Sequence, residues 1–157
     1  MKRAIRTLAS ASIAGVRAIK DKDTEGGGMA QVKIYGLRAS IERHRGTLSE
    51  AIHQAVVEAL SYPPEKKFQR FISLEAENLI VPEDRTASYT IVEISMFEGR
   101  TAEAKKSLVR ALFRNIEQAC GIAPQDVEIT IFETPKENWG IRGKSGDELA
   151  LSYKVNV

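Results

Sequence analysis

The segment YTIVEISMFEGRTAEAKKSLVRALFRNIEQACGIAPQDVEITIFET, residues 89–134, decides the fold. Residues 90–96 are rich in β-branched side chains and present a largely apolar face, which is typical of a strand. From there to 119, apolar residues recur at steps of three and four, which predicts a helix capped by Thr101 and Gly121 and blocked by Pro124. A second β-rich run follows. The segment therefore predicts two parallel strands joined by a right-handed crossover helix.

The preceding part of the chain repeats this order at an offset of about sixty residues. Residues 32–35 and 69–74 alternate between apolar and polar side chains and are expected to be strands. Residues 36–45 are expected to be a polar connection, after which Thr47 or Ser49 caps a helix. The apolar stripe of that helix consists of Leu48, Ile52, Ala55, Val56, Ala59 and Leu60.

Two such strand–helix–strand units, at about 30–75 and 89–134, predict an α+β (α/β) fold with one four-stranded mixed sheet and both helices on one face. Residues 75–88, which link the units, are expected to be an irregular, exposed turn. The other face of the sheet would be partly apolar, and assembling subunits commonly bury such a surface. The alternating tail at 151–157 is expected to add a strand to the sheet edge of a neighbouring subunit.

Residues 1–28 differ in composition from the domain expected at 29–157. The first part of this extension is basic and lacks acidic side chains, a composition that overlaps with that of a transit peptide. It ends in DKDTEGGG, which has the polar, glycine-rich character of a flexible linker. We expect the extension to be disordered or non-native. Translation is expected to start at Met29, so that Ala30 becomes the first residue of the mature chain.

Composition and charge exclude several classes of function. The 157 residues are 43% hydrophobic and 28% charged, as in ordinary globular domains, and a net charge of +2 is too small to indicate nucleic-acid binding. Cys120 is the only cysteine, and His44 and His53 are too far apart in sequence for one helix face, so no disulfide and no metal site are expected. No apolar run approaches the roughly 20 residues that cross a bilayer, and we expect a cytoplasmic protein without membrane partners.

Three short segments point to a family: FEGRT at 97–101, CGIAPQDV at 120–127 and NWG at 138–140. Together with the paired strand–helix–strand units, they resemble the tautomerase superfamily, which has the 4-oxalocrotonate tautomerase-like fold. The closest resemblance is to its malonate-semialdehyde-decarboxylase-like, long-chain group, over about residues 30–138. The resemblance implies a homotrimer that uses no cofactor and no metal. It also implies active sites at the amino end of the first strand, near subunit boundaries.

The resemblance further implies proton-transfer chemistry. In this family an amino-terminal proline acts as general base or acid, and nearby arginines hold the substrate carboxylate. Ala30 stands in the place of that proline and is the candidate catalytic residue, acting through a primary amine. Of a pair of arginines in the decarboxylase group, the second is kept as Arg100 and the first is replaced by Glu98. Lys66 stands where that group has an aspartate; Glu98 and Lys66 are expected to be surface charges.

Four side chains are candidates for binding the substrate. Arg100 precedes a helix at the end of a strand, where family members bind carboxylate, and Trp139 matches the family's aromatic wall. Arg142, in the glycine-rich segment that follows, and Arg38, after the first strand, are candidates for further contacts. Each has a simpler alternative: a solvated arginine, or a core or interface position for Trp139.

Two functions remain open. The first is a tautomerase or isomerase, weak or altered in activity, that acts on a small keto or enol carboxylate. The second is a non-catalytic trimeric module that binds a carboxylate or a protein partner. The replacement of the amino-terminal proline by Ala30 favours the second function, whereas the paired units with Arg100 and Trp139 favour the first.

Overall fold

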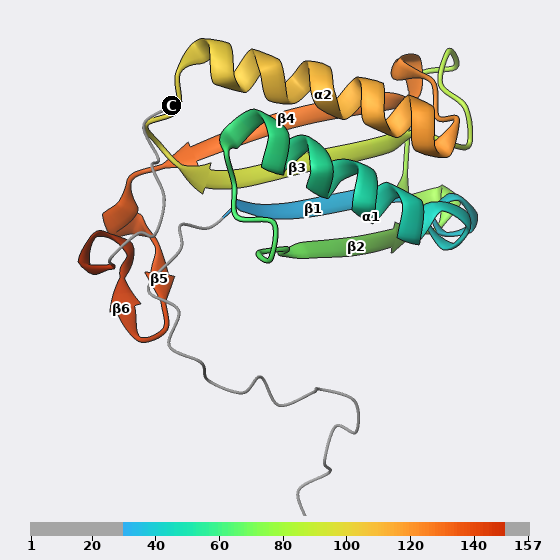
Figure 1. Ribbon diagram of the computed structural model, residues 1–157. Coiled ribbons are helices and arrows are strands. Elements are labelled where there is room, and N and C mark those ends of the chain that lie inside the picture. Colours follow the sequence, from blue (N-terminus) through green and yellow to red (C-terminus); the bar gives the residue numbers. More distant parts are fainter. Residues whose placement is uncertain (1–29, 150–157) are drawn as a thin grey trace, which may run out of the picture.

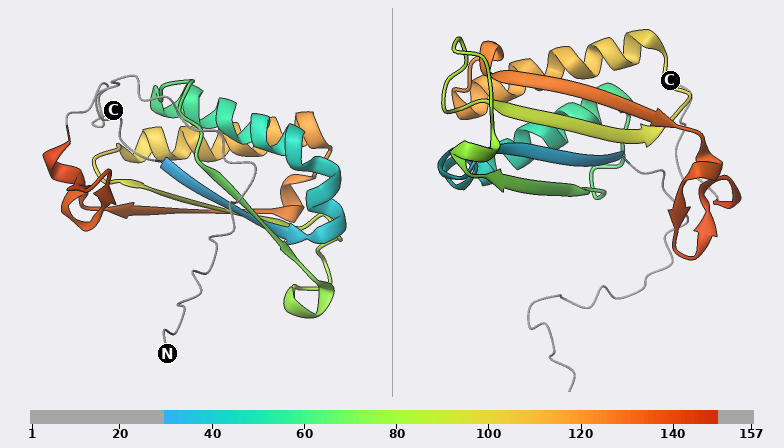
Figure 2. Two further views of the ribbon diagram at one scale, coloured as in Figure 1. Left: turned by 90° about the horizontal axis from the view of Figure 1, so that it is seen from below. Right: turned by 180° about the vertical axis from the view of Figure 1, so that it is seen from behind.

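The computed structural model describes residues 30–149, in which two long helices cover one face of a four-stranded sheet (Figures 1 and 2). A two-stranded hairpin lies beyond the strand ends on one side of that sheet (Figure 1). The main elements are β1 (Ala30–Leu37), α1 (Arg38–Leu60), β2 (Gln69–Leu74), β3 (Thr90–Phe97), α2 (Ala102–Cys120) and β4 (Val127–Thr134). The hairpin consists of β5 (Gly140–Ile141) and β6 (Lys144–Ser145).

The sheet has the strand order β2-β1-β3-β4. β1 pairs with β2 and β3 pairs with β4 in parallel, whereas the two central strands, β1 and β3, are antiparallel. The register places Ala30 opposite Met96, and Met96 beside Glu133. The amino end of β1 and the carboxyl ends of β3 and β4 therefore meet along one edge of the sheet, by which we mean a side formed by strand ends and not an outer strand. The hairpin lies next to this edge (Figures 1 and 2). The predicted pair of strand–helix–strand units in a mixed sheet is confirmed.

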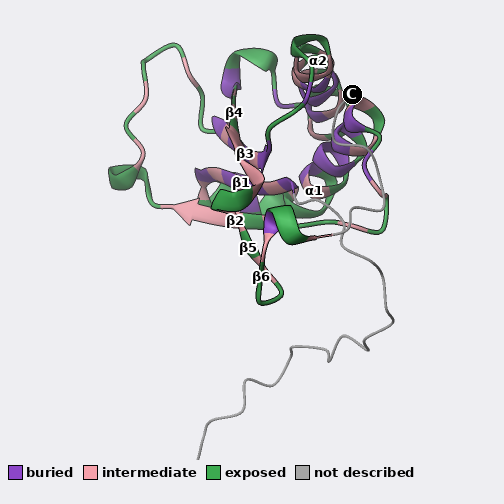
Figure 3. Ribbon diagram, turned by 90° about the vertical axis from the view of Figure 1, so that its left-hand side faces the viewer, coloured by how far each residue is buried: buried purple, intermediate pink, exposed green. Residues whose placement is uncertain are grey.

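The core lies between the sheet and the helices. Alternate residues of β1 and β3 are buried against the helices, which is the period of a strand covered on one face. The buried residues of α2 follow the predicted steps of three and four and are Leu108, Ala111, Leu112 and Ile116. The helix faces turned away from the sheet are exposed (Figure 3). This packing fixes the ends of both helices relative to the edge where β1 begins.

The caps of α2 are those predicted. Thr101 Oγ1 accepts a hydrogen bond from the backbone N–H of Ala104 at 3.1 Å. Gly121 ends the helix with a φ of 67°, in the left-handed region where a residue without Cβ meets no steric penalty. The chain then enters β4, which lies parallel to β3. Both the helix and the parallel pairing expected for this segment are confirmed.

The first helix begins earlier than predicted. α1 starts at Arg38, so the polar connection expected at 36–45 is wrong, and Thr47 and Ser49 lie inside the helix instead of capping it. The early start was missed because the first turns of α1 bury few apolar side chains. Ile41 is buried, while the six residues that follow it are exposed or half-buried. Residues 38–47 are therefore helical, with Ser40 and Ile41 as their buried residues, because the rest of the helix packs on the sheet.

The segment after β4 forms the β5–β6 hairpin between short 3₁₀ turns. The Gly146 N–H donates to the Trp139 carbonyl oxygen at 2.7 Å and closes the hairpin. A Cβ at Gly146 would lie 2.5 Å from the Lys136 carbonyl oxygen and 2.9 Å from the Phe97 ring. Only glycine fits there without displacement. The hairpin is therefore packed directly against the end of β3.

Two predictions lie outside the described residues: the extension at 1–28 with its start at Met29, and the strand at 151–157. Within residues 30–149, no helix combines the length and the apolar character needed to span a membrane. Nor do three or more His, Cys, Asp or Glu side chains of this part of the chain gather as they would around a metal ion.

Candidate functional site

Ala30 is buried at the amino end of β1, and its nitrogen has a defined partner. The backbone N–H donates to Tyr62 Oη at 3.3 Å, in a buried contact between residues 32 positions apart. Tyr62 follows the end of α1, where Ser61 adopts a left-handed conformation with a φ of 48° and reverses the chain. Only 3% of Tyr62 is exposed. The nitrogen that the family resemblance associates with catalysis thus lies in an enclosed polar contact.

Arg100 lies beside this pair and is also buried, with 8% of the residue exposed. Its Nη1 donates to the carbonyl oxygen of Leu60, the last residue of α1, at 2.9 Å. The last carbonyls of a helix have no partner within the helix and carry the negative end of its dipole, so a guanidinium stabilises them. This bond uses one of the five N–H donors of the guanidinium. Arg100 therefore ties the β3–α2 connection to the end of α1.

The Tyr62 phenol is affected by both neighbours. Burial raises its pKa above the usual value, whereas the hydrogen bond from the Ala30 N–H and the positive charge of Arg100 oppose that rise. The Glu65 carboxylate adds a smaller upward contribution to the pKa. Because the pKa is raised, the phenol is neutral at about pH 7, and it is close enough to Arg100 to be influenced by the guanidinium charge.

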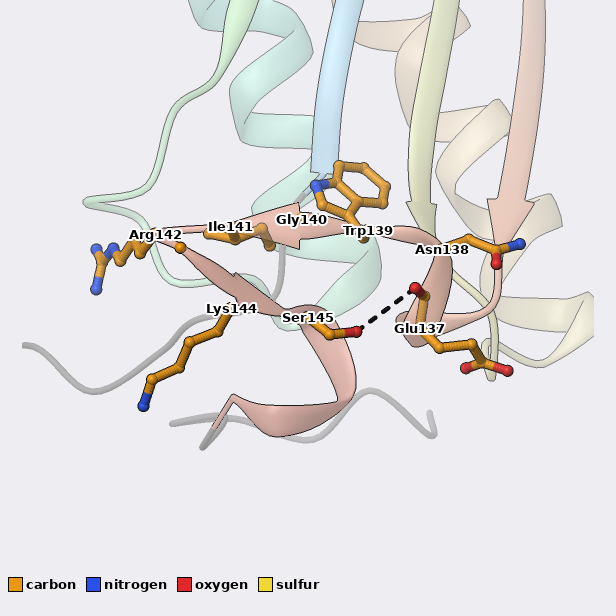
Figure 4. Close-up of a pocket in the computed structure, with 9 residues that line it drawn as sticks. Glu137, Asn138, Trp139, Gly140, Ile141, Arg142, Lys144 and Ser145 are labelled. Carbon is orange, nitrogen blue, oxygen red and sulfur yellow. Dashed lines mark hydrogen bonds between the residues drawn. The ribbon is translucent and has the colours of Figure 1, made fainter.

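The hairpin that carries Trp139 stands at the same edge (Figure 4). Trp139 packs edge to face against Phe97, the last residue of β3, with ring centroids 5.3 Å apart. An open pocket of about 430 Å³ lies on the hairpin, and its described lining residues are Glu137, Asn138, Trp139, Gly140, Ile141, Arg142, Gly143, Lys144 and Ser145. Ala30 and Arg100 do not border this pocket. The Trp139 indole points toward β1, away from Arg142 (Figure 4).

Arg142 and Lys66 are two further cations, one in the hairpin and one in the connection between α1 and β2. Arg142 is exposed at the hairpin turn, with a φ of 53°. Lys66 is half-buried in the connection between α1 and β2. Burial lowers the pKa of the Lys66 ammonium, Glu65 opposes that change, and the charge of Arg142 lowers the pKa further. The charge of Arg142 therefore acts on Lys66, which lies in a separate segment of the chain.

Arg38 does not join this group within one chain. It begins α1 at the carboxyl end of β1, where its guanidinium pairs with Glu75 at the end of β2. That hydrogen bond raises the pKa of the Arg38 guanidinium. Ala30 begins the same eight-residue strand, and extended backbone of that length spans roughly 25 Å. The expectation that Arg38 faces the Ala30 site is therefore wrong for a single chain, because the two residues flank opposite ends of β1.

The sequence pattern does not single out Tyr62, since the run YPP at 62–64 predicts only the end of a helix. The position of Tyr62 depends on other contacts. Its N–H donates to the Val57 carbonyl oxygen at 3.3 Å, and His53 Nε2 lies 2.7 Å from the Pro64 carbonyl oxygen. A buried tyrosine hydroxyl requires a hydrogen-bond partner, which is the one available signal. The identity of that partner depends on where β1 enters the sheet.

The chain is similar to several known proteins. The sequence profile of the family described as tautomerase enzyme matches residues 66–142. The 2-hydroxymuconate tautomerase of Comamonas testosteroni is 42% identical over 57 residues, which are 36% of this chain and 90% of that protein. This chain belongs to the tautomerase family.

Other proteins match a larger part of this tautomerase-family chain. The probable tautomerase YrdN of Bacillus subtilis (strain 168) is 29% identical over 98 residues, covering 59% of this chain and 74% of the relative. Malonate semialdehyde decarboxylase superimposes with a TM-score of 0.66 at 20% identity, over 73% of this chain and 92% of that chain. Native fused 4-OT superimposes with a TM-score of 0.65 at 20% identity, over 74% of this chain and 96% of that chain. These likenesses confirm the predicted tautomerase-like fold.

Proposed function

We propose that this tautomerase-family chain interconverts the keto and enol forms of a small carboxylate without a cofactor, with the amino group of Ala30 as general base. The observation that carries the proposal is the buried contact between the Ala30 nitrogen and Tyr62 Oη, 3.3 Å apart, beside the Arg100 guanidinium. The family of the chain, and the name of its relative 2-hydroxymuconate tautomerase, support this class of reaction.

The reaction requires only the movement of protons. The amine accepts the proton of the enol hydroxyl, the C=O bond forms, and the electrons of the C=C bond take a proton back from the ammonium to form a C–H bond. An α-amine has a reference pKa of about 7.7–8.0, and a nearby positive charge such as that of Arg100 is expected to lower the pKa toward neutrality. A backbone amide has no basic lone pair. The proposal therefore applies to the form of the protein that begins at Ala30.

The substrate carboxylate is assigned to the cations at this edge of the sheet. Arg100 supplies a guanidinium beside Ala30, and Arg142 with Lys66 supplies two further positive charges. Trp139 is assigned to the aromatic wall, since it is half-buried and packed on the end of β3.

A homotrimer is part of the proposal. The sheet face turned away from the helices carries side chains that one chain leaves partly exposed: Tyr35, Ile72, Leu74, Ile91 and Phe132. Phe132 is 49% exposed. Subunit assembly commonly buries such a face. The fused 4-OT proteins that share this fold are described as trimers, which supports the same assembly here.

The test of the amine compares two forms of the protein, one that begins at Ala30 and one that retains Met29. We expect the first form to convert the enol of phenylenolpyruvate to its keto form. Retaining Met29 displaces the free amine and is expected to lower kcat/KM at least about a hundredfold, the effect typical of losing a general base. Equal unfolding midpoints would show that both forms fold alike. Equal turnover by the two forms would exclude the Ala30 amine as the base.

The test of carboxylate binding uses two exposed cations of the hairpin. Arg142→Gln is expected to raise KM about tenfold, because a charge-assisted hydrogen bond to the substrate is lost. Lys144→Gln is the matched control: Lys144 is exposed on the same hairpin, whereas the charge that lowers the pKa of the Lys66 ammonium is that of Arg142. Steady-state kinetics of both variants decide the matter, and equal values of KM would remove Arg142 from the substrate site.

A second candidate function is a non-catalytic module that binds carboxylates. Two observations favour it: Ala30 replaces the proline of the family, and Arg100 is engaged by the Leu60 carbonyl oxygen. Calorimetric titration with a small 2-keto carboxylate separates the two functions. Binding without turnover by the form that begins at Ala30 would support the module and reject the enzyme.

A further inference from the structure

We propose that Tyr62 is a positioning residue for the amino group of Ala30: its hydroxyl orients that nitrogen and stabilises it when it carries the transferred proton. The inference rests on the proposed function, in which this amine moves the proton of the substrate. It assigns a role to a residue that lies outside the segments carrying the family resemblance.

The contact between the Ala30 nitrogen and Tyr62 depends on the fold, and hydrogen bonds before and after Tyr62 in the chain fix the position of Tyr62. The Ala30 nitrogen lies 3.3 Å from Tyr62 Oη, and the two residues are 4% and 3% exposed. The Tyr62 N–H is bonded to the last turn of α1 through the Val57 carbonyl oxygen. The segment that follows is fastened by His53, whose Nε2 lies 2.7 Å from the Pro64 carbonyl oxygen. A side chain fixed in this way loses little further freedom when it holds the amine.

A phenol hydroxyl suits both protonation states of an amine. It accepts a hydrogen bond from an ammonium and donates one to a neutral amine. Burial keeps Tyr62 neutral by raising the pKa of its phenol. Among the described residues, charged groups that act on the phenol include Arg100, before α2, and Glu65, in the same connection as Tyr62. Arg100 favours the neutral amine, and the accepting hydroxyl counteracts it by favouring the ammonium.

Tyr62→Phe removes the acceptor and leaves the ring. Without it, the pKa of the Ala30 amine is expected to fall by about one unit, because the ammonium loses a hydrogen bond while the cations remain. The acid limb of the pH profile of kcat/KM is expected to move by the same amount to lower pH. The plateau value of kcat/KM is expected to fall about tenfold, since the lone pair is less well oriented.

Three measurements test the inference, with Tyr89→Phe as the matched control. Tyr89 is also buried and donates to Glu128, but it precedes β3 and so lies at the other edge of the sheet. The first measurement is the pH profile of kcat/KM. The second is an NMR titration of ¹⁵N-labelled Ala30 in the form that begins there, which needs no substrate. The third is hydrogen exchange of the Ala30 amide in the full chain, expected to be about tenfold faster in Tyr62→Phe and unchanged in the control.

The outcomes separate this inference from the proposed function. If the parent protein shows no turnover, the proposed function fails, while titration and exchange still test Tyr62. An amine pKa and an amide exchange rate that are the same in Tyr62→Phe as in the parent would refute the inference, whatever the activity. Should the variant not fold, replacing Tyr62 by 3-fluorotyrosine keeps the shape and weakens the oxygen as acceptor. The expected result is then a smaller downward shift of the amine pKa, and its absence overturns the inference.

Discussion

Arg100→Ala is expected to lower the free energy of unfolding by about 2–4 kcal/mol. The guanidinium is buried and donates to the Leu60 carbonyl oxygen at 2.9 Å, and a hydrogen bond that involves a charged group contributes about 1.5–3 kcal/mol. Removal also leaves the last carbonyl of α1 without this donor in a buried place and takes away the packing of the arginine stem. The sum should exceed the effect of any exposed ion pair.

Urea unfolding followed by the fluorescence of Trp139 measures this change. All variants are compared at one protein concentration, because subunit assembly adds a concentration-dependent contribution to stability. The matched control is Arg114→Ala. Arg114 lies 2.9 Å from the Glu58 carboxylate, but the side chains are 48% and 60% exposed, so the loss should be about 0–1 kcal/mol.

Arg100→Lys supplies an intermediate. It keeps a positive charge near the carboxyl end of α1 but loses the planar fork of the guanidinium, so its stability should lie between those of the parent and Arg100→Ala. If Arg100→Ala is no more destabilised than Arg114→Ala, the bond to Leu60 does not stabilise the fold. The interpretation of Arg100 as the residue that joins α2 to the end of α1 would then be abandoned.

Three further predictions concern the hairpin, the long connection and alkaline pH. Gly146→Ala is expected to displace the hairpin from β3, because the added methyl would approach other atoms closer than 3.0 Å; faster hydrogen exchange of the hairpin amides checks this, and Gly140→Ala, where a Cβ meets nothing within 4 Å, should leave exchange unchanged. Asp126→Ala is expected to cost about 1–3 kcal/mol of stability in urea unfolding, because its buried carboxylate accepts hydrogen bonds from both the N–H and the hydroxyl of Thr86; an unchanged midpoint would contradict it. Stability is expected to fall from pH 10 to about 12, because burial and a hydrogen bond to a carboxylate raise the pKa of Tyr89 from 10.0 to about 12, so that the folded protein retains a proton which the unfolded chain releases. Tyr89→Phe should lack this part of the fall in stability. Unfolding free energies of the parent and of Tyr89→Phe, measured at about pH 9 and about pH 11, check this, and an equal decline in both proteins would contradict it.

The second strand–helix–strand unit could be predicted because its signals are local. Thr101 and Gly121 act within one or two turns of the helix they delimit, and the β-branched strands lie immediately beyond them. The start of α1 was not predictable in this way. Its N-cap position is Leu37, which makes no side-chain capping bond, and in the first turns Ile41 is the one buried apolar residue. Packing on the sheet, and not a capping signal, decides where α1 begins.

The residues of the candidate site likewise fall into two groups, those that the sequence indicates and those that only the structure brings to the site. Arg100 and Trp139 belong to short segments that carry the family resemblance, and the structure brings both to the edge where β1 begins. Tyr62 and Lys66 could not be assigned from sequence. Each contributes through a partner in another segment, Ala30 at 32 positions for the first and Arg142 for the second. Contacts of this length leave no periodic trace in the sequence.

The sequence by itself determined the order of the main elements, the extent of the second strand–helix–strand unit and the family of the chain, because caps, apolar spacing and motifs act over a few residues. Only the tertiary structure decided which ends of those elements meet. The antiparallel pairing of β1 and β3 brings Arg100 to the beginning of β1, beside Ala30, and leaves Arg38 at the opposite edge. The direction in which two distant strands pair is selected by the burial of the whole core, and no single segment encodes it.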